Sequence, residues 1–300
     1  MSVGPYQLAT ACVQGLSHRK SDPPVPCQDA CMGLTLSNGF PVAIVSDGAG
    51  SSSFSHLASD FCVRRLSEVC ESYIPRFVLL GEIDDSTEVN RGHIRHQWHQ
   101  IAMDMFRETR SALLDFGAQN GHSASELHCT LILLIRTPFG FLSANIGDGR
   151  AGYHNGSSAA PLIVPFMTYT AGATYFLAKE GWEPIFRSSV VYDDSVDYFF
   201  ATSDGCQSFV IDSSQKGPRK GIYNDVLGDE AFYDYNHPYD PFFRGLIESL
   251  RETQSPEEAD ARLVKLIDSG IYVHKGEERE LKSLSDPSLD DDKSIVIFYR

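Results

Sequence analysis

Three apolar, strand-like runs in this chain each end at an aspartate that is followed directly by glycine. They are PVAIVSDGAG (41–50), LSANIGDGRAGY (142–153) and VDYFFATSDG (196–205), and a fourth run, SIVIFYR (294–300), follows an acidic cluster at 290–292. Asp-Gly alone is an ordinary turn signal, because glycine accepts positive φ and aspartate hydrogen-bonds its own backbone. Because the same pattern recurs at three strand ends, a second interpretation is favoured, in which the aspartates act together. If these strands are neighbours in one core, their ends meet and their carboxylates converge.

Composition limits the classes of protein that the chain can belong to. Its 300 residues are 42% hydrophobic, enough to bury a large core, and no run of eighteen apolar residues predicts a membrane span. The first residues lack a basic stretch followed by an apolar one, so we expect no secretory signal. A net charge of −15 makes nucleic acid and anionic membranes poor partners.

Cysteine usage indicates a reducing compartment. The seven cysteines are scattered without C-x-x-C pairs, which argues against a disulfide framework or a zinc ribbon. Cys27 and Cys31 flank Asp29 without metal-ligand spacing, so the default interpretation is small packed thiols. We therefore expect a cytoplasmic protein.

Strand-like and helical patterns alternate irregularly along the chain. Strands are expected within 1–16, in a hairpin over 31–46, and at 128–136 and 197–203. Apolar periodicity predicts helices over 54–72 and 93–117, and a capping box at 255–258 begins a third helix that ends near 269. Residues 17–30 are proline-rich and are expected to be a loop. The pattern predicts an α+β layered fold, and 1–300 as a single domain because no linker divides it.

Five acidic positions could carry chemistry: Asp29, Asp47, Asp148, Asp204 and Asp291. Four of them lie at an end of an expected apolar strand. Carboxylates packed within ~4–6 Å of one another cannot all stay ionised unless a cation neutralises them. Mg²⁺ and Mn²⁺ prefer carboxylate, carbonyl and water oxygens, and a glycine such as Gly48 lets the backbone approach an ion.

The order of the motifs resembles a known family. CQDA (27–30), SDGAG (46–50), HCT (128–130), IGDGRAGY (146–153), TSDG (202–205) and DDKS (291–294) are together similar to the metal-dependent protein phosphatases of type 2C. The resemblance runs from Gly15 to Arg300 and is greatest to a bacterial branch with G-x-S-H and C-Q-D elements. It implies a four-layer α-β-β-α sandwich, in which two packed antiparallel sheets are flanked by helices.

The resemblance also implies a ligand set for two Mn²⁺ or Mg²⁺ ions. Asp47 matches the aspartate that bridges both ions, and the Gly48 carbonyl matches a further ligand. Asp204 and Asp291 match terminal ligands of one ion, and Asp29 matches the carboxylate that holds the other, largely through water. Asp148 matches the aspartate often linked to a third, looser ion; its alternative role is to cap a hairpin.

The implied activity is hydrolysis of phosphoserine or phosphothreonine in proteins. Hydroxide bridging the two ions would attack phosphorus in line, without a phosphoenzyme. Members of this family commonly oppose a serine/threonine kinase, so the resemblance implies a cognate kinase as partner. The alternative is a catalytically weak or inactive phosphatase-like module that regulates or binds phosphoproteins.

Three positions depart from the family pattern. The arginine that usually grips the substrate phosphate is replaced by His18, with Arg19 adjacent, and either residue is a candidate phosphate contact. Ala49 stands where some animal members have a histidine. Residues 290–292 are all aspartate, and we prefer Asp291 over Asp292 because Ser294 then falls where the family places a hydroxyl.

Three further segments have unexceptional interpretations. His93, His96 and His99 recur every three residues in an expected helix, which favours a solvated face over a metal site. The aromatic and acidic segment 222–243 either shapes the substrate cleft or is a packed surface excursion. By resemblance, 166–192 would form a flap over the site.

Overall fold

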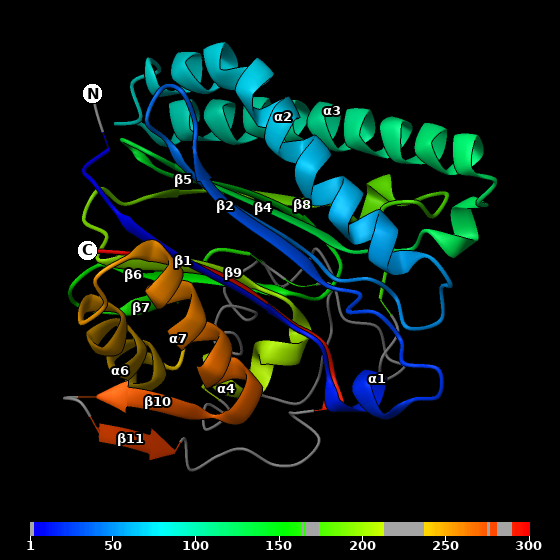
Figure 1. Cartoon of the computed structure of the whole chain (residues 1–300). Coiled ribbons are helices and arrows are strands. Elements are labelled where there is room, and N and C mark those ends of the chain that lie inside the picture. Colours follow the sequence, from blue (N-terminus) through cyan, green and yellow to red (C-terminus); the bar gives the residue numbers. More distant parts are fainter. Residues whose placement is uncertain (1–2, 164, 166–173, 213–236, 275–276, 281–289) are drawn as a thin grey trace, which may run out of the picture.

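The computed structural model has two stacked antiparallel sheets with helices on both outer faces (Figure 1). It describes residues 3–163, 165, 174–212, 237–274, 277–280 and 290–300. Most of the segment 222–243 lies outside the described residues, as do residues 166–173 of the expected flap. Among the described residues, no helix is both long enough and apolar enough to cross a bilayer.

The first sheet contains the C-terminal strand at an interior position, next to an edge strand. Its order is β1 (Gln7–Val13), β12 (Lys293–Tyr299), β9 (Tyr198–Thr202), β6 (Arg150–His154) and β7 (Ala159–Pro161). In the pairing of β12 with β9, Ile295 lies opposite Thr202. The start of β12 therefore lies beside the end of β9, which brings the acidic cluster at 290–292 next to Asp204.

The second sheet is a meander of hairpins with one later strand at its edge. Its order is β2 (Ala30–Thr35), β3 (Pro41–Ser46), β4 (Leu131–Thr137), β5 (Gly140–Ile146) and β8 (Arg187–Tyr192). Ala30 lies opposite Ser46, so the start of β2 and the end of β3 coincide. Asp29 and Asp47 therefore leave the sheet at the same edge.

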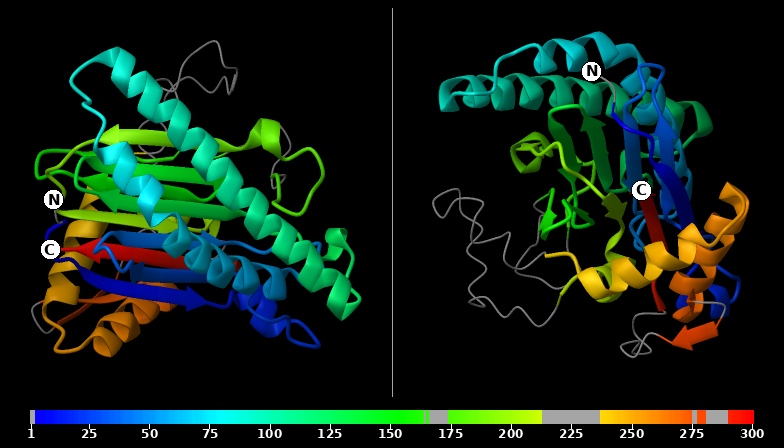
Figure 2. Two further views of the ribbon diagram at one scale, coloured as in Figure 1. Left: turned by 90° about the horizontal axis from the view of Figure 1, so that it is seen from above. Right: turned by 90° about the vertical axis from the view of Figure 1, so that its left-hand side faces the viewer.

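The helices form the two outer layers, as the orthogonal views show (Figure 2). Helices α2 (Ser55–Gly81) and α3 (Glu88–Asn120) pack on the second sheet, and α6 (Asp240–Arg251) and α7 (Pro256–Ser269) pack on the first. The smaller elements are α1 (Leu16–Lys20), α4 (Gln207–Val210), the 3₁₀ turns η1 (Ala124–Glu126), η2 (Glu183–Ile185) and η3 (Asp204–Cys206), and the hairpin β10 (Ile271–His274)–β11 (Glu277–Glu280).

The two sheets are held face to face by an aromatic and aliphatic layer. Phe199 of β9 stacks on Phe298 of β12 with ring centroids 4.8 Å apart. It also meets the edge of Phe141 from the opposing sheet, at 5.3 Å. All three rings are fully or almost fully buried. The strand ends that carry the aspartates are therefore fixed by a close-packed interior.

The predicted α+β, four-layer architecture is confirmed. The structure differs from the sequence-based expectations in where the helices begin and end. The helix expected over 54–72 continues through Pro75 to Gly81. The helix expected over 93–117 begins at Glu88, because the Thr87 hydroxyl accepts the Asn90 N–H and caps it. The expectation of a loop over 17–30 was wrong at its start, where α1 occupies Leu16–Lys20.

The three histidines of α3 lie on its solvated face. His93, His96 and His99 are exposed, and the first two contact glutamines one turn onward at 2.8 and 3.0 Å. The interpretation of this run as a solvated face is confirmed for His93 and His96, whereas His99, although exposed, also contacts the Ser188 hydroxyl of β8 at 2.9 Å.

Replacing Phe199 with alanine should destabilise the protein by about 3–5 kcal/mol, because the cavity would open between two sheets that cannot collapse onto it. Urea unfolding measures the change. Leu79→Ala is the control, since Leu79 is 59% exposed and its truncation should cost less than about 0.5 kcal/mol. Equal losses in the two variants would contradict the packing account.

Candidate metal centre

Three aspartates from three separate strand ends converge in the structure. Asp47 directly follows β3, Asp148 lies in the connection between β5 and β6, and Asp204 begins η3 just after β9. One carboxylate oxygen from each lies within 4.8 Å of the others. The two sheets thus bring together residues 157 positions apart (204 − 47).

The backbone around Asp47 is held by Thr130, a residue for which the sequence offered the HCT motif but no role. The Asp47 N–H donates to Thr130 Oγ1 at 3.0 Å, and the Thr130 N–H donates to the Asp47 carbonyl at 2.8 Å. The Ser46 hydroxyl donates to the Thr130 carbonyl at 2.6 Å. These bonds fix the strand end from which the carboxylate projects.

Gly48 packs against the segment that precedes Asp29. Its N–H donates to the Gln28 carbonyl at 3.0 Å. A Cβ at this position would lie 2.6 Å from that same oxygen, so a larger residue would push the two segments apart. The glycine after Asp47 is therefore required by close backbone approach as well as by turn chemistry.

Asp29 is not one of the three aspartates whose oxygens converge, but its charge acts on Asp47, and it is buried with 6% of its surface exposed. Neither of its carboxylate oxygens has a hydrogen-bond partner among the described residues. Burial, followed by the charges of Asp292 and Asp204, raises its pKa to about 7, although the nearby hydroxyls of Ser203 and Ser294 lower it in part. A buried carboxylate with two uncommitted oxygens is costly unless a cation or a proton satisfies it.

The pKa values of Asp47 and Asp204 are also raised by burial and by neighbouring negative charges. Burial raises the pKa of Asp47 well above its ordinary value, and the charges of Asp29 and Asp204 add to that shift. The pKa of Asp204 rises to about 6 through burial and the charges of Asp148 and Asp291, while a hydrogen bond with Asp47 lowers it in part. Without a cation, the pair therefore tends to retain a proton between its carboxyl groups.

The two neighbouring acids at the start of β12 have different surroundings. Partial desolvation of its carboxyl group raises the pKa of Asp291, and the charge of Asp291 in turn raises the pKa values of Asp47, Asp148 and Asp204. Asp292 instead accepts two backbone hydrogen bonds, each of 2.6 Å, from the N–H groups of Gly15 and Gln28. Asp291 is thus exposed to solvent and acts on the three aspartates through its charge, whereas Asp292 is buried and ties distant segments together.

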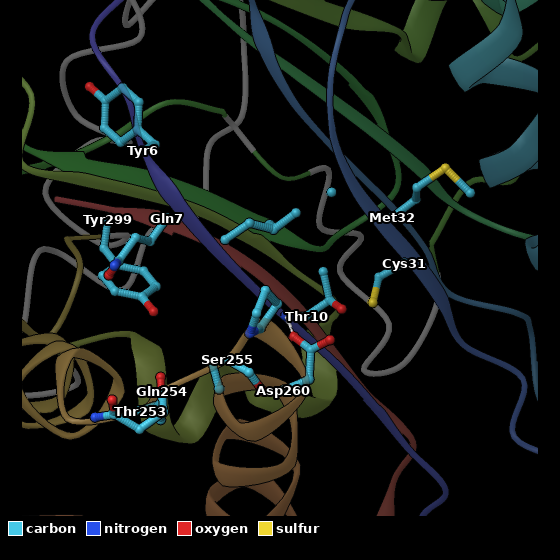
Figure 3. Close-up of a pocket in the computed structure, with 14 residues that line it drawn as sticks. Tyr6, Gln7, Thr10, Cys31, Met32, Thr253, Gln254, Ser255, Asp260 and Tyr299 are labelled. Atoms are coloured by element: carbon cyan, nitrogen blue, oxygen red, sulfur yellow. Dashed lines mark hydrogen bonds between the residues drawn. The ribbon is translucent and has the colours of Figure 1, made fainter.

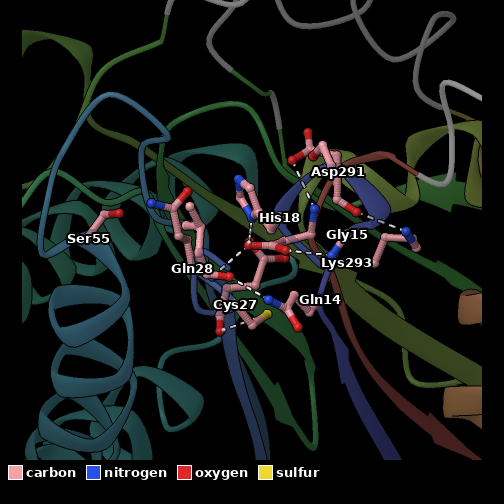
Figure 4. Close-up of polar contacts among 12 residues, drawn as sticks. Gln14, Gly15, His18, Cys27, Gln28, Ser55, Asp291 and Lys293 are labelled. Carbon is pink, nitrogen blue, oxygen red and sulfur yellow. Dashed lines mark hydrogen bonds and ion pairs between the residues drawn. The ribbon is translucent and has the colours of Figure 1, made fainter. Parts of the chain in front are cut away.

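The two candidate phosphate contacts have protein partners, and Figure 4 shows the surroundings of one of them, His18. His18 Nδ1 lies 2.9 Å from Asp292 Oδ2. Arg19 forms an ion pair with Asp268 of α7 at 2.5 Å. The G-x-S-H and C-Q-D elements therefore meet at Asp292, an association that no local pattern in the sequence reveals.

The donor set fits divalent cations that prefer oxygen. Besides Asp29, the described part of the chain leaves Asp148 Oδ1 buried without a hydrogen-bond partner. The converging side-chain donors are carboxylates, and the raised pKa values of Asp47 and Asp204 indicate that positive charge is favourable between them. Mg²⁺ and Mn²⁺ match this chemistry.

A cavity of about 620 Å³ lies elsewhere, between β1, β2 and the start of α7 (Figure 3). Tyr6, Thr10, Asp260 and Tyr299 are among its lining residues, and none of the clustered aspartates is. Its volume therefore says nothing about the metal centre.

The raised pKa values predict an unusual pH dependence of stability. Folded Asp29 and Asp204 bind protons more tightly than they do in the unfolded chain, where the pKa is 3.8. The metal-free protein should therefore lose stability as the pH rises from about 4 to about 7. Asp29→Asn should flatten this slope and raise the free energy of unfolding at pH 8 by roughly 2–4 kcal/mol.

Urea unfolding in chelator across this pH range checks the prediction. Asp115→Asn is the matched control, because Asp115 is exposed on α3 and its replacement should leave the slope unchanged. A slope in Asp29→Asn equal to that of the unaltered protein would contradict the strain assigned to Asp29.

Solved structures share this fold at low sequence identity. Serine/threonine phosphatase Stp1 from Staphylococcus aureus is 14% identical with a TM-score of 0.58, and the match covers 100% of this chain and 97% of that one. The S. agalactiae serine/threonine phosphatase is 12% identical with a TM-score of 0.55, covering 98% and 99%. PppA, a key regulatory component of T6SS in Pseudomonas aeruginosa, is 15% identical with a TM-score of 0.51, covering 100% and 99%. At such identities the likeness shows the fold alone.

Sequence comparison with families is more specific. No curated protein matched the chain in a sequence search. A family model described as Protein phosphatase 2C, in contrast, matches residues 14–268, which is most of the chain. The chain therefore belongs to the protein phosphatase 2C family and is a protein serine/threonine phosphatase.

Proposed function

We propose that this phosphatase hydrolyses phosphoserine and phosphothreonine by direct attack of water on phosphorus, at a centre that holds two Mn²⁺ or Mg²⁺ ions. The observation that carries the proposal is the convergence of Asp47, Asp148 and Asp204 oxygens within 4.8 Å of one another. We assign Asp47 and the Gly48 carbonyl as bridging and supporting ligands. Asp148 would serve a third, looser ion.

Asp204 and Asp291 are proposed as terminal ligands, with Asp292 as a positioning residue. The contacts support this division, because Asp292 already accepts hydrogen bonds from Gly15, Gln28 and His18. A carboxylate so occupied has little capacity left for a cation. Asp291 contributes its charge to the cluster instead.

Asp29 is proposed to orient water. Its Oδ1 and Oδ2 are buried and uncommitted among the described residues, so both can accept hydrogen bonds from water in the centre. Bound divalent cations would supply positive charge for the phosphoryl oxygens and acidify water near neutral pH. Attack in line forms one P–O bond and breaks the ester P–O bond, and the leaving serine or threonine oxygen takes up a proton.

The neighbouring thiols favour this direct route over a phosphocysteine intermediate. Burial raises the pKa of Cys31 and of Cys206 to about 12, so both are held as thiols near neutral pH. Hydrogen bonding to Cys12, together with burial, raises the pKa of Cys27 further. A protonated thiol is a poor nucleophile.

The phosphate grip is proposed to be indirect. For direct contact with phosphate, His18 would have to leave Asp292 and Arg19 would have to leave Asp268. We therefore treat His18 as a residue that positions Asp292, and Arg19 as a tie to α7. The physiological substrates are proposed to be cytoplasmic phosphoproteins, with a serine/threonine kinase acting in opposition.

The first test is hydrolysis of a phosphothreonine peptide by the purified full chain. Mn²⁺ should restore activity after chelation, and Asp47→Asn should lower kcat/KM more than about a hundredfold, because it removes a shared ligand. Asp115→Asn is the control and should stay within about twofold. Activity that survives exhaustive chelation would refute the metal mechanism, and absence of Mn²⁺ binding by calorimetry would indicate the non-catalytic module instead.

A second test separates the two adjacent aspartates. Asp291→Asn should weaken Mn²⁺ binding more than about tenfold without lowering the stability of the metal-free protein. Asp292→Asn should lower that stability by about 2–3 kcal/mol, because charge-assisted bonds to two backbone N–H groups and His18 are weakened. Calorimetry and urea unfolding measure both quantities. The reverse pattern would make Asp292 the ligand.

A further inference from the structure

Two thiols lie beside the metal centre and take no part in the proposed chemistry. Cys12 is in β1, near its end, and Cys27 lies three residues before β2 begins. Their Sγ atoms are 3.5 Å apart. Cys12 is exposed and Cys27 is partly buried, so a small oxidant can reach the pair from solvent.

A second thiol pair provides an internal comparison. Cys62 Sγ and Cys129 Sγ are 3.7 Å apart, almost the same separation. Both residues are completely buried in the core between α2 and the second sheet. Proximity is therefore similar in the two pairs, and exposure distinguishes them.

We propose that Cys12 and Cys27 form an oxidative modification site, which a peroxide converts into a disulfide. Hydrogen peroxide would oxidise the exposed Cys12 thiol to a sulfenic acid and release one water. The Cys27 sulfur then attacks the sulfenic sulfur and gives its proton to the sulfenic oxygen, which leaves as a second water as the S–S bond forms. The raised pKa of Cys27 makes this second step slow, and the 3.5 Å separation of the two sulfurs favours it over reaction with a thiol from solution. Two electrons pass from the thiols to the peroxide, and a dithiol reductant reverses the step.

Forming this bond requires a local movement of the two cysteines beside Asp29. An S–S bond is about 2.0 Å long, so the two sulfurs must approach by about 1.5 Å. Cys12 belongs to an edge strand of one sheet, and Cys27 leads into an edge strand of the other. The bond would therefore link the two sheets close to Asp29.

The same thiols hold the backbone of Asp29. The Cys12 S–H donates to the Asp29 carbonyl at 3.2 Å, and the Cys27 thiol contacts that oxygen at 3.9 Å. Both donors disappear when the disulfide forms. The carbonyl must then find another partner or shift.

Gln28 transmits the movement to the rest of the centre. Its N–H donates to Asp292, and its carbonyl accepts from the Gly48 N–H at 3.0 Å and from the Ser59 hydroxyl at 2.6 Å. Displacing Cys27 therefore displaces the residues on either side of the proposed metal site. This coupling rests on the proposed function, and it predicts at least tenfold weaker Mn²⁺ binding in the oxidised protein.

Peptide mapping after peroxide treatment tests the modification itself. Trypsin places Cys12 alone in peptide 1–19, whereas peptide 21–64 carries Cys27, Cys31 and Cys62. After free thiols are blocked, 1–19 should be joined to 21–64 with a loss of two hydrogens, and fragmentation should place the link at Cys27. Cys129 should be blocked only after denaturation.

Three serine variants sharpen the assignment. Cys12→Ser and Cys27→Ser should each abolish the link, whereas Cys31→Ser should retain it. The peroxide dose is one that oxidises free glutathione completely. If Cys12 in peptide 1–19 of the unaltered protein still reacts fully with the thiol-blocking reagent after this dose, the proposal is overturned.

Manganese calorimetry on reduced and oxidised full-length protein tests the coupling. Oxidation should weaken binding at least tenfold, a dithiol should restore it, and Cys12→Ser should be insensitive to peroxide. Hydrogen exchange of the Gly48 amide tests the same coupling without metal. Oxidation should speed this exchange, because the Gly48 N–H would lose its hydrogen bond to the Gln28 carbonyl. A disulfide that alters neither quantity would overturn the coupling, whereas reduced protein that binds no Mn²⁺ contradicts the proposed function and leaves the mapping result intact.

Discussion

Repulsion among closely packed, largely desolvated carboxylates is the constraint on which the rest of this structure depends. Asp47, Asp148 and Asp204 present oxygens within 4.8 Å of one another, and Asp29 and Asp291 add their charges. Such a group is stable only when protons or cations compensate it. The surrounding hydrogen bonds and packing keep the carboxylates from moving apart. Because the repulsion cannot be relieved by movement, binding a cation becomes the favourable way to relieve it.

The restraint comes from contacts between segments far apart in the chain. The packed faces of the two sheets fix the strand ends. Thr130 fixes the backbone of Asp47 through two hydrogen bonds, in which its hydroxyl accepts from the Asp47 N–H and its own N–H donates to the Asp47 carbonyl. Asp292 joins the start of β12 to Gly15 and Gln28, more than 260 residues earlier. These ties are buried and hydrogen-bonded, which is the condition under which ionic groups hold rather than weaken a fold.

The sequence predicted the strands, their acidic ends and, through family resemblance, the four layers, because alternation and Asp-Gly turns are local signals. It could not predict the contact of His18 with Asp292, which depends on how strand β12 passes α1. Helix α6 was missed although its signal was present: proline follows Asp240 at the first turn, and Phe242, Phe243, Leu246, Ile247 and Leu250 follow helical spacing. There the aromatic and acidic character of 222–243 obscured the periodicity. The contact between the buried thiols of Cys62 and Cys129 could not be predicted either, because these residues are far apart in the sequence.

Anomalous diffraction from crystals soaked in Mn²⁺ tests the central claim most directly, because it locates the ions without reference to activity. The account predicts manganese peaks about 2.0–2.5 Å from carboxylate oxygens of Asp47 and Asp204, with Asp291 rather than Asp292 at the same centre. Peaks confined to other acidic surfaces, or well-ordered Asp47 and Asp204 side chains that point apart with no manganese between them, would contradict it.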